Sequence, residues 1–162
     1  MLLLTGPTAA GKNTIARALA LRQERCAIVD VDLIRAMFVQ PHCPPWMGDE
    51  GHAQAILGAE LASRVARGFH DAGWKVVLLD VITNDVFPAY QKALAPGPFT
   101  VIQILPTFDE NQGRFDARGP VLTQDEFAWV YERQRQFRHA ARTIDNSALP
   151  PEAVAIELEP YL

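Results

Sequence analysis

Short, continuous apolar runs recur along the chain and are separated by longer segments with helical periodicity. The runs cover residues 2–5, 26–31, 75–81 and 99–105, and a weaker run covers residues 142–145. A run of four to seven apolar residues without polar alternation is typical of a strand that is covered on both faces. The pattern therefore predicts a three-layer α/β fold, in which a five-stranded parallel sheet lies between two layers of helices.

The segments between the predicted strands carry helix signals. Residues 52–73 have helical periodicity and end at Gly73, a residue type suited to a left-handed C-cap. The apolar stripe of this helix consists of Leu57, Leu61, Val65 and Phe69.

Capping boxes mark the starts of two further helices, at Thr107 with Glu110 and at Thr123 with Glu126. Residues 40–51 contain three prolines and two glycines, which predicts a loop.

A glycine-rich loop follows the first predicted strand. Gly6 is followed by four residues and then by Gly11 and Lys12, which is the spacing of a phosphate-binding loop. Such a loop aims backbone N–H groups and the positive end of a helix at one point, where a phosphate chain binds. Lys12 adds a positive charge for the β- and γ-phosphates. We therefore predict that ATP is the cofactor and that its phosphates contact Gly6, Pro7, Thr8, Ala9, Ala10, Gly11, Lys12, Asn13 and Thr14.

Asn13 stands where this motif has Ser or Thr, whose hydroxyl usually contacts Mg²⁺. An amide oxygen is also a hard acceptor, and Mg²⁺ in phosphoryl-transfer sites keeps several water ligands. The sequence GKNT resembles the GKGT of adenylate kinases and related nucleoside monophosphate kinases, which lack a hydroxyl at this position. The departure therefore weakens one metal contact and leaves the predicted Mg²⁺ site in place.

Three aspartates lie at the ends of predicted strands. Asp30 and Asp32 are two residues apart, a spacing that on a strand points both carboxylates the same way, toward the γ-phosphate. One would orient metal-bound water, and the other would accept a proton from an attacking hydroxyl. A structural alternative exists for Asp32, because Asp is a common N-cap and a helix is predicted from Leu33. Asp80 ends the third strand and would hold a Mg²⁺ water, so the predicted metal residues are Asn13, Asp30 and Asp80.

The order of these motifs is similar to that of the shikimate kinase, gluconate kinase and chloramphenicol phosphotransferase group of small phosphate-loop kinases. The shared order is the phosphate loop, a strand ending in Asp-x-Asp, a long helix, a strand ending in Leu-Leu-Asp and an Arg-x-x-x-Arg segment, and it covers nearly the whole chain. The resemblance implies the sheet order 2-3-1-4-5, with Asp32 as the general base and Asp30 in the metal shell. Shikimate kinases carry three glycines after the third strand, where this chain has DVITND, so shikimate is not the expected acceptor.

A lid is predicted at about residues 107–123. Arg114 and Arg118 lie one helical turn apart in it, with Pro120 shortly after. A solvated basic face is one explanation of such a pair. The resemblance to mobile kinase lids implies instead that Arg118 reaches the transferring phosphate and that Arg114 covers the base. Residues 145–152 resemble the adenine-side loop of these kinases.

The Pro-rich loop is where acceptors bind in the resembling kinases. Trp46, in this loop, either contacts the acceptor or packs the loop onto the core, and the sequence leaves both open. Arg35 and Asp85 are further candidates for acceptor contact.

Composition narrows the classes of partner. A net charge of −4 weighs against nucleic acid, because phosphate neutralisation normally requires a basic patch. No apolar run approaches the length of a membrane span, so no membrane contact is expected. Two cysteines, Cys26 and Cys43, cannot form a disulfide framework and fit a reducing cytoplasm.

Together these patterns predict one domain over residues 1–162 that works as a cytoplasmic, ATP- and Mg²⁺-dependent phosphotransferase, either a monomer or a homodimer. It would transfer the γ-phosphate to a hydroxyl of a small molecule, with Asp32 as base and with Lys12 and Arg118 stabilising charge. The alternative is a nucleotide-binding ATPase module that acts through a partner protein. The chain lacks the extra helical domain and sensor arginines of motor-type ATPases, which favours the kinase.

Overall fold

The computed structural model describes residues 1–119 and 121–162; Pro120, which the sequence places beside the predicted lid arginines, lies outside the described residues. A single parallel sheet forms the centre of the molecule, in the order β2-β3-β1-β4-β5. Its strands are β1 (Leu2–Thr5), β2 (Cys26–Asp30), β3 (Lys75–Asp80), β4 (Thr100–Ile104) and β5 (Arg142–Ile144). The predicted strand order and parallel arrangement are therefore confirmed.

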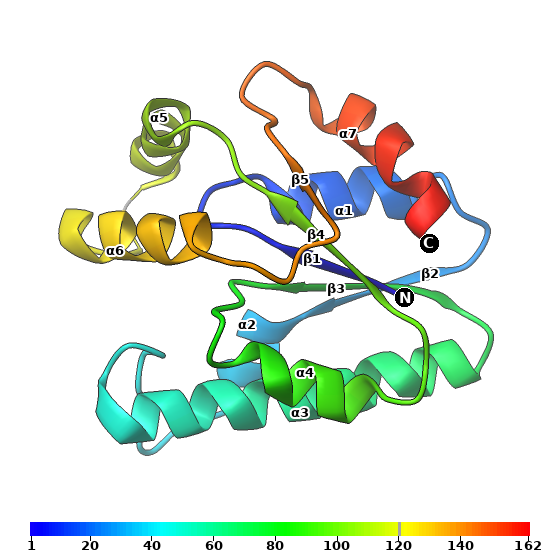
Figure 1. Cartoon of the computed structure of the whole chain (residues 1–162), viewed down its shortest axis with the longest axis horizontal. Coiled ribbons are helices and arrows are strands. Elements are labelled where there is room, and N and C mark those ends of the chain that lie inside the picture. The colour runs from blue at the N-terminus through cyan, green and yellow to red at the C-terminus, as the bar shows by residue number, and fades with distance from the viewer. Residues whose placement is uncertain (120) are drawn as a thin grey trace.

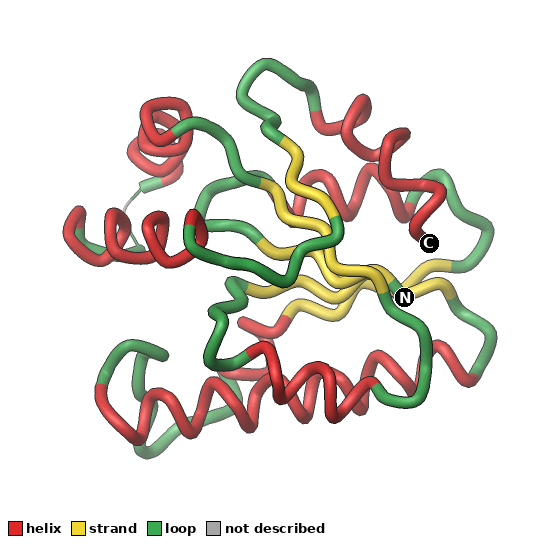
Figure 2. The backbone as a smooth tube through the Cα atoms, viewed as in Figure 1, coloured by secondary structure: helices red, strands yellow, loops and turns green. Residues whose placement is uncertain are grey.

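Helices cover both faces of the sheet. The described helices are α1 (Lys12–Ala20), α2 (Val31–Arg35), α3 (Gly48–Asp71), α4 (Phe87–Leu94), α5 (Phe108–Arg118), α6 (Gln124–Arg135), α7 (Pro151–Leu158) and a final 3₁₀ turn, η1 (Glu159–Tyr161). Helices α1 and α7 lie on one face, α3 and α4 lie on the other, and α5 and α6 lie beyond the carboxyl ends of the strands (Figure 1). Figure 2 shows the strands as the middle of these three layers, which confirms the predicted fold class.

The central strands are buried on both sides, which explains their unbroken apolar runs. On β1, Leu2 and Leu4 belong to the core under α1 and α7, whereas Leu3 belongs to the core under α3 and α4. All three side chains are at most 1% exposed. Because successive side chains of a strand point to opposite faces, a strand between two helical layers needs apolar residues at every position.

Helix α3 packs on the sheet through a different side from the one its large apolar residues suggest. Leu57, Val65 and Phe69 of the predicted stripe are each at least 40% exposed. Nearly all of its buried positions are small, which lets the helix approach β2, β3 and α4 closely. The buried residues are Gly51, Gln54, Ala55, Gly58, Ala59, Ala62, Ser63 and Ala66.

The predicted loop at residues 40–51 ends earlier than expected, because α3 begins at Gly48. Gly51 lies against the preceding proline segment, where an added Cβ would be 2.0 Å from the Pro44 carbonyl oxygen. Asp49 and Glu50 occupy the first turn of α3 and interact favourably with the helix dipole. The glycine that indicated a loop thus allows close packing of the helix start.

Other local predictions are confirmed, one of them only in part. Gly73 has a left-handed φ of 81° after α3, and its N–H donates to the His70 carbonyl. Thr123 forms a complete capping box with Glu126 at the start of α6. Thr107 caps α5, but the reciprocal bond of the predicted box is absent, because Glu110 accepts from Arg114 and the Thr107 N–H donates to Ser147. Among the described residues, no helix combines the length and the apolarity that crossing a bilayer requires.

Candidate active site

The phosphate loop joins β1 to α1 at the carboxyl edge of the sheet. Gly6 packs directly on β4, and an added Cβ would lie 2.2 Å from the Ile104 carbonyl oxygen, so only glycine fits there. Ala9 and Gly11 both have left-handed backbones, with φ of 64° and 92°. Alternation of left- and right-handed residues turns successive N–H groups to one side and forms an anion-binding concavity.

Two buried asparagines brace this loop from outside. Asn111 of α5 donates from Nδ2 to the Thr8 carbonyl at 3.1 Å, and Asn146, after β5, donates from Nδ2 to the Ala10 carbonyl at 2.9 Å. The first N–H groups of α1 have no acceptor within the helix and point toward the same concavity. The backbone is therefore preformed for a phosphate chain, and these residues fit the triphosphate of ATP. Neither asparagine was singled out from the sequence.

Lys12 lies at the centre of a cluster of acids. Its Nζ donates to the carbonyls of Gly6 and Pro7 at 2.8 and 3.0 Å. Burial lowers the pKa of Lys12 to about 8, although the nearby carboxylates of Asp32, Asp80 and Asp30 raise it in part. The three predicted acids therefore lie within electrostatic reach of the loop lysine.

We expect the affinity for Mg-ATP to fall by about tenfold between pH 7 and pH 9. Below a pKa of about 8 the Lys12 ammonium is present to bind phosphate, and above it the free protein loses that charge, so binding must first restore a proton. Calorimetry at several pH values measures this trend. The Lys12→Arg variant is the control, because an arginine stays charged across this range. Equal affinity of the unmodified chain at both pH values would contradict the assignment.

Asp30, and not Asp32, caps helix α2. Asp30 Oδ1 accepts from the Asp32 N–H at 3.1 Å, and its Oδ2 accepts from Asn13 Nδ2 at 2.7 Å. The alternative that Asp32 is the N-cap is wrong, because α2 begins at Val31 and Asp32 lies in its first turn. The expectation that both acids extend from one strand is also wrong, because β2 ends at Asp30. The side chain of Asp32 is 76% exposed and thus open to a ligand.

The amide group of Asn13 has one engaged atom. Its Nδ2 donates to Asp30, and among the described residues no donor binds its Oδ1, which can therefore contact a metal ion. We expect Asn13→Thr to preserve or increase the affinity for Mg-ATP, because a hydroxyl at this position can bind Mg²⁺ directly on an unchanged backbone. Asn13→Ala, which removes the oxygen ligand, should bind Mg-ATP more weakly. Calorimetry with and without Mg²⁺ separates the two effects. A loss in Asn13→Thr that is independent of Mg²⁺ would show that Asn13 holds the loop and not the metal.

Asp80 is partly buried at the end of β3, and both of its oxygens accept hydrogen bonds. Oδ2 accepts from the Tyr90 hydroxyl at 2.6 Å, and Oδ1 accepts from the Val81 N–H at 2.7 Å. Burial raises the pKa of Asp80, the Tyr90 hydrogen bond opposes this rise, and the charge of Asp32 adds to it. The role of Tyr90 cannot be predicted from the sequence, because a tyrosine in an apolar helix resembles a core residue.

Arg35 lies near two of the predicted acids, Asp32 in α2 and Asp80 at the end of β3. Its Nη1 is 3.7 Å from Asp32 Oδ1, its side chain is only 16% exposed, and its charge lowers the pKa of Asp80. Gly58 of α3 makes room for it, since a Cβ there would lie 2.8 Å from Arg35 Cγ. The structure therefore places Arg35 beside the predicted base.

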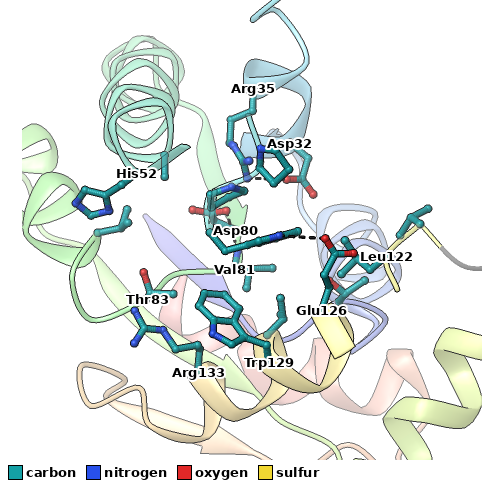
Figure 3. A pocket seen from close by; sticks show the side chains of 18 of the residues that line it. Asp32, Arg35, His52, Asp80, Val81, Thr83, Leu122, Glu126, Trp129 and Arg133 are labelled. Atoms are coloured by element: carbon teal, nitrogen blue, oxygen red, sulfur yellow. Dashed lines mark hydrogen bonds and ion pairs between the residues drawn. The ribbon is translucent and has the colours of Figure 1, made fainter. Parts of the chain in front are cut away.

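A cavity of about 620 Å³ connects this cluster with the acceptor candidates. Its phosphate end is lined by Thr8, Asp32, Asp80 and Arg118. We call its other end the acceptor end, defined by Trp46, His52, Asp85, Trp129 and Arg133. Figure 3 shows side chains from α2, α3 and α6 and from the segment after β3 around this space. The predicted residues Thr8, Asp32, Arg35, Trp46, Asp80, Asp85 and Arg118 thus line one cavity. Lys12, Asn13, Asp30, Arg114 and the other residues of the phosphate loop do not line it.

Trp46 joins the Pro-rich loop to α6. Its Nε1 donates to Glu126 Oε1 at 3.1 Å, and its ring lies 6.0 Å from that of Trp129 at an angle of 55°. Trp46 also lines the cavity, so it both fastens the loop and faces a ligand. The place of Trp129 at the cavity cannot be predicted from the sequence, since its partner Trp46 is far away along the chain.

Asp85 is shared by two basic side chains. Oδ1 lies 3.3 Å from Arg133 Nη2, and Oδ2 lies 3.4 Å from His52 Nδ1. Burial alone would raise the pKa of Asp85, but hydrogen bonds from Thr83 and from its own backbone, together with Arg133 and His52, lower it below its usual value. The guanidinium of Arg133 also lies over the Trp129 ring, 5.2 Å from its centroid.

A buried glutamine positions helix α6 over the ends of the strands. Gln134 Oε1 accepts from the Thr5 hydroxyl at 3.2 Å, and its Nε2 donates to the Ile82 carbonyl at 2.7 Å. Because a buried amide without partners is costly, these bonds fix the helix relative to β1 and the segment after β3. Trp129 and Arg133, on the same helix, are thereby held at the cavity.

The two arginines of the predicted lid have different surroundings. Arg114 donates from Nη2 to the Asn146 carbonyl at 2.9 Å and pairs with Glu110, so it is bound to the predicted adenine-side loop and is not part of a solvated face. Arg118 lines the cavity and is close enough to lower the pKa of Lys12.

Within the described residues, no group of three or more His, Cys, Asp and Glu side chains could hold a metal ion. Mg²⁺ bound to nucleotide phosphates keeps several waters and needs only one or two protein ligands. Asn13, Asp30 and Asp80 therefore still fit the predicted role, partly through water.

Comparison with solved structures identifies the fold. A sugar kinase from Janibacter sp. is 15% identical, with a TM-score of 0.73 over 99% of this chain and 92% of that chain. An Acinetobacter baumannii shikimate kinase, in complex with shikimate, is 18% identical, with a TM-score of 0.64 over 97% and 89%. A Mycobacterium tuberculosis APS kinase, in complex with AMPPNP and APS, is 15% identical, with a TM-score of 0.69 over 99% and 95%.

Neither models of protein families nor curated protein sequences give a match to this chain. The structural likeness nevertheless confirms the predicted resemblance at the level of the fold, which is that of the small phosphate-loop kinases.

Proposed function

We propose that this protein is an ATP-dependent kinase that transfers the γ-phosphate to a hydroxyl of a small molecule. The observation that carries the proposal is one cavity that extends from Thr8 of the phosphate loop and Asp32 to the acceptor end. Ligand pockets of several hundred cubic ångströms with a few convergent polar groups are typical of small-molecule sites. The structural neighbours described as kinases support the same reaction class.

Different residues at the phosphate end would bind the phosphates, the base and the metal ion of Mg-ATP. The backbone of residues 6–14 would hold the phosphates, Arg114 would lie near the base, and Asn13, Asp30 and Asp80 would hold Mg²⁺, partly through water. Bound Mg-ATP supplies the transferable phosphoryl group and a divalent charge that neutralises it. Lys12 and Arg118 would stabilise the charge that develops on the transferring oxygens.

Asp32 is the proposed general base. Its exposed carboxylate faces the cavity and would accept the proton of the acceptor hydroxyl as that oxygen attacks. Asp80 is less suited to this role, because both of its oxygens already accept hydrogen bonds. Arg35 would hold the Asp32 side chain in place as a positioning residue.

The proposal is tested by incubating the protein with Mg-ATP and a pool of sugars, nucleosides and hydroxylated antibiotics. We expect one compound to gain the mass of one phosphate, and the Lys12→Ala variant to leave the pool unchanged. The competing function is an ATPase module that acts through a partner protein. ATP hydrolysis that responds to a protein partner, with no phosphorylated compound in the pool, would overturn the kinase proposal. Three further properties are predictions from the sequence: that the chain forms one domain, that it is cytoplasmic, and that it is a monomer or a homodimer.

A further inference from the structure

We infer that the acceptor end binds an uncharged, polyhydroxylated ring, as in a sugar or a sugar-bearing compound, and that it rejects carboxylate acceptors. This inference rests on the proposed kinase function and narrows its substrate class. It follows from three features of the acceptor end, which are its charge balance, its hydrogen-bonding groups and its aromatic wall.

The arginine of the acceptor end is already neutralised. Binding of a carboxylate requires a guanidinium or ammonium that is free to form paired hydrogen bonds. Arg133 instead pairs with Asp85 at 3.3 Å. Glu126, which also lines the cavity and accepts from Trp46 of the acceptor end, adds a negative charge that disfavours an anionic acceptor beside it.

A cationic acceptor is not favoured either, because the carboxylates are occupied. Asp85 is shared by Arg133 and His52. Glu126 accepts from the Trp46 indole N–H and from the backbone and hydroxyl of Thr123. An ammonium group would have to displace one of these partners, whereas a neutral ligand would not.

The same groups suit hydroxyls. A hydroxyl both donates and accepts, so it is recognised best where donors and acceptors lie side by side. Arg133 supplies guanidinium donors, Asp85 supplies carboxylate acceptors, and His52 and Thr83 complete the set. A ligand with several adjacent hydroxyls can accept from Arg133 and donate to Asp85, and it adds no net charge to the cavity.

The tryptophans provide an apolar wall for one face of the ring. Trp46 and Trp129 lie with centroids 6.0 Å apart and planes inclined at 55°, so they form an angled wall and not a slot for a flat ring. Trp129 is 42% exposed. The C–H face of a cyclic polyol is apolar while its rim is polar, which matches an aromatic wall bordered by Asp85 and Arg133.

The first experiment compares matched compounds that differ in one group. Glucose, glucosamine and glucuronate, and the corresponding galactose series, are offered with Mg-ATP, and phosphate transfer is measured by mass. Binding is measured separately by tryptophan fluorescence in a Trp74→Phe background, since Trp74 is the remaining one of three tryptophans and does not line the cavity. We expect a neutral sugar to be preferred over its uronate by at least about tenfold in kcat/KM, a difference of about 1.4 kcal/mol.

The second experiment releases Arg133. Asp85→Asn keeps the size of the side chain and removes the charge that neutralises Arg133. The preference for the neutral sugar over the uronate should therefore fall by about tenfold or reverse. Asp125→Asn is the matched control, because Asp125 is an exposed acid on α6, the helix of Arg133, and does not line the cavity. The selectivity of this variant should not change. Trp129→Ala should raise KM more than it lowers kcat.

The outcomes separate this inference from the proposed function. A preference of the unmodified chain for the uronate or the hexosamine would overturn the inference, and so would unchanged selectivity in folded Asp85→Asn. Normal Mg-ATP binding with no sugar of either series bound or phosphorylated would also overturn it, while the kinase proposal would stand. Failure to bind Mg-ATP would instead contradict the proposed function.

Discussion

Replacement of Lys12 by alanine is expected to weaken Mg-ATP binding by about tenfold to a hundredfold without loss of the fold. A hydrogen bond to a charged group contributes about 1.5–3 kcal/mol, and Lys12 is the loop's own cation. Its Nζ bonds only to the Gly6 and Pro7 carbonyls among the described residues, and burial lowers its pKa, so folding already disfavours the charged form. The free energy of unfolding should therefore be unchanged or slightly higher in the variant.

Calorimetry gives the affinity, and thermal unfolding in the absence of nucleotide gives the stability. Lys92→Ala is the matched control, because Lys92 is an exposed lysine on α4 that does not line the cavity and should leave both quantities unchanged. Normal Mg-ATP affinity in a folded Lys12→Ala protein would defeat the assignment of residues 6–12 as a phosphate-binding loop.

The parts of the fold that the sequence predicts are those with a local signal. Continuous apolar runs locate the central strands β1, β3 and β4, because burial on both faces of the sheet demands apolar side chains at nearly every position. The edge strands β2 and β5 are less buried, and the signal of β5 is correspondingly weak. The phosphate loop also has a local signal, since its two glycines and its lysine stand at a fixed spacing and the left-handed backbone at Gly11 favours glycine. Spacing alone therefore identifies it.

The errors arise where burial or geometry depends on a distant element. The large apolar residues of α3 predict the wrong buried side, because its alanines allow closer approach to the sheet than Leu57 or Phe69 would. The alternative that Asp32 caps α2 lies two residues after the true cap, since Asp30 and Asp32 are equally good N-cap types and only the end of β2 decides between them.

The acceptor end could be predicted only in part. Trp46 and Asp85 were found because they follow predicted helices and strands at the edge where ligands bind. Their partners on α6, Trp129 and Arg133, gave no signal, because on a polar helix they resemble solvated residues until the bonds of the buried Gln134 place that helix at the cavity. Which side chains meet at the cavity depends on how the elements are arranged in the fold, and not on the spacing of residues in the sequence.

The substitution with the largest expected effect on the reaction is Asp32→Asn. A positioned general base typically contributes about a hundred- to ten-thousand-fold to the rate, and Asn keeps the size of the side chain while removing the proton acceptor. Stability should change little, because Asp30 supplies the cap, and the ion pair of the exposed Asp32 carboxylate with Arg35 is long, at 3.7 Å, and contributes about 1 kcal/mol. Mg-ATP affinity and slow hydrolysis without acceptor should persist.

Asp30→Asn is the paired variant that distinguishes catalysis from local structure. Asn caps a helix about as well as Asp, so α2 should remain intact, and the change should instead weaken the Mg²⁺ dependence through the lost charge beside Asn13. Rates of transfer to one identified acceptor, measured with melting temperatures for both variants, provide the comparison. If folded Asp32→Asn transfers phosphate at nearly the normal rate, Asp32 is not the base, and Asp80, whose pKa burial raises, becomes the next carboxylate to substitute.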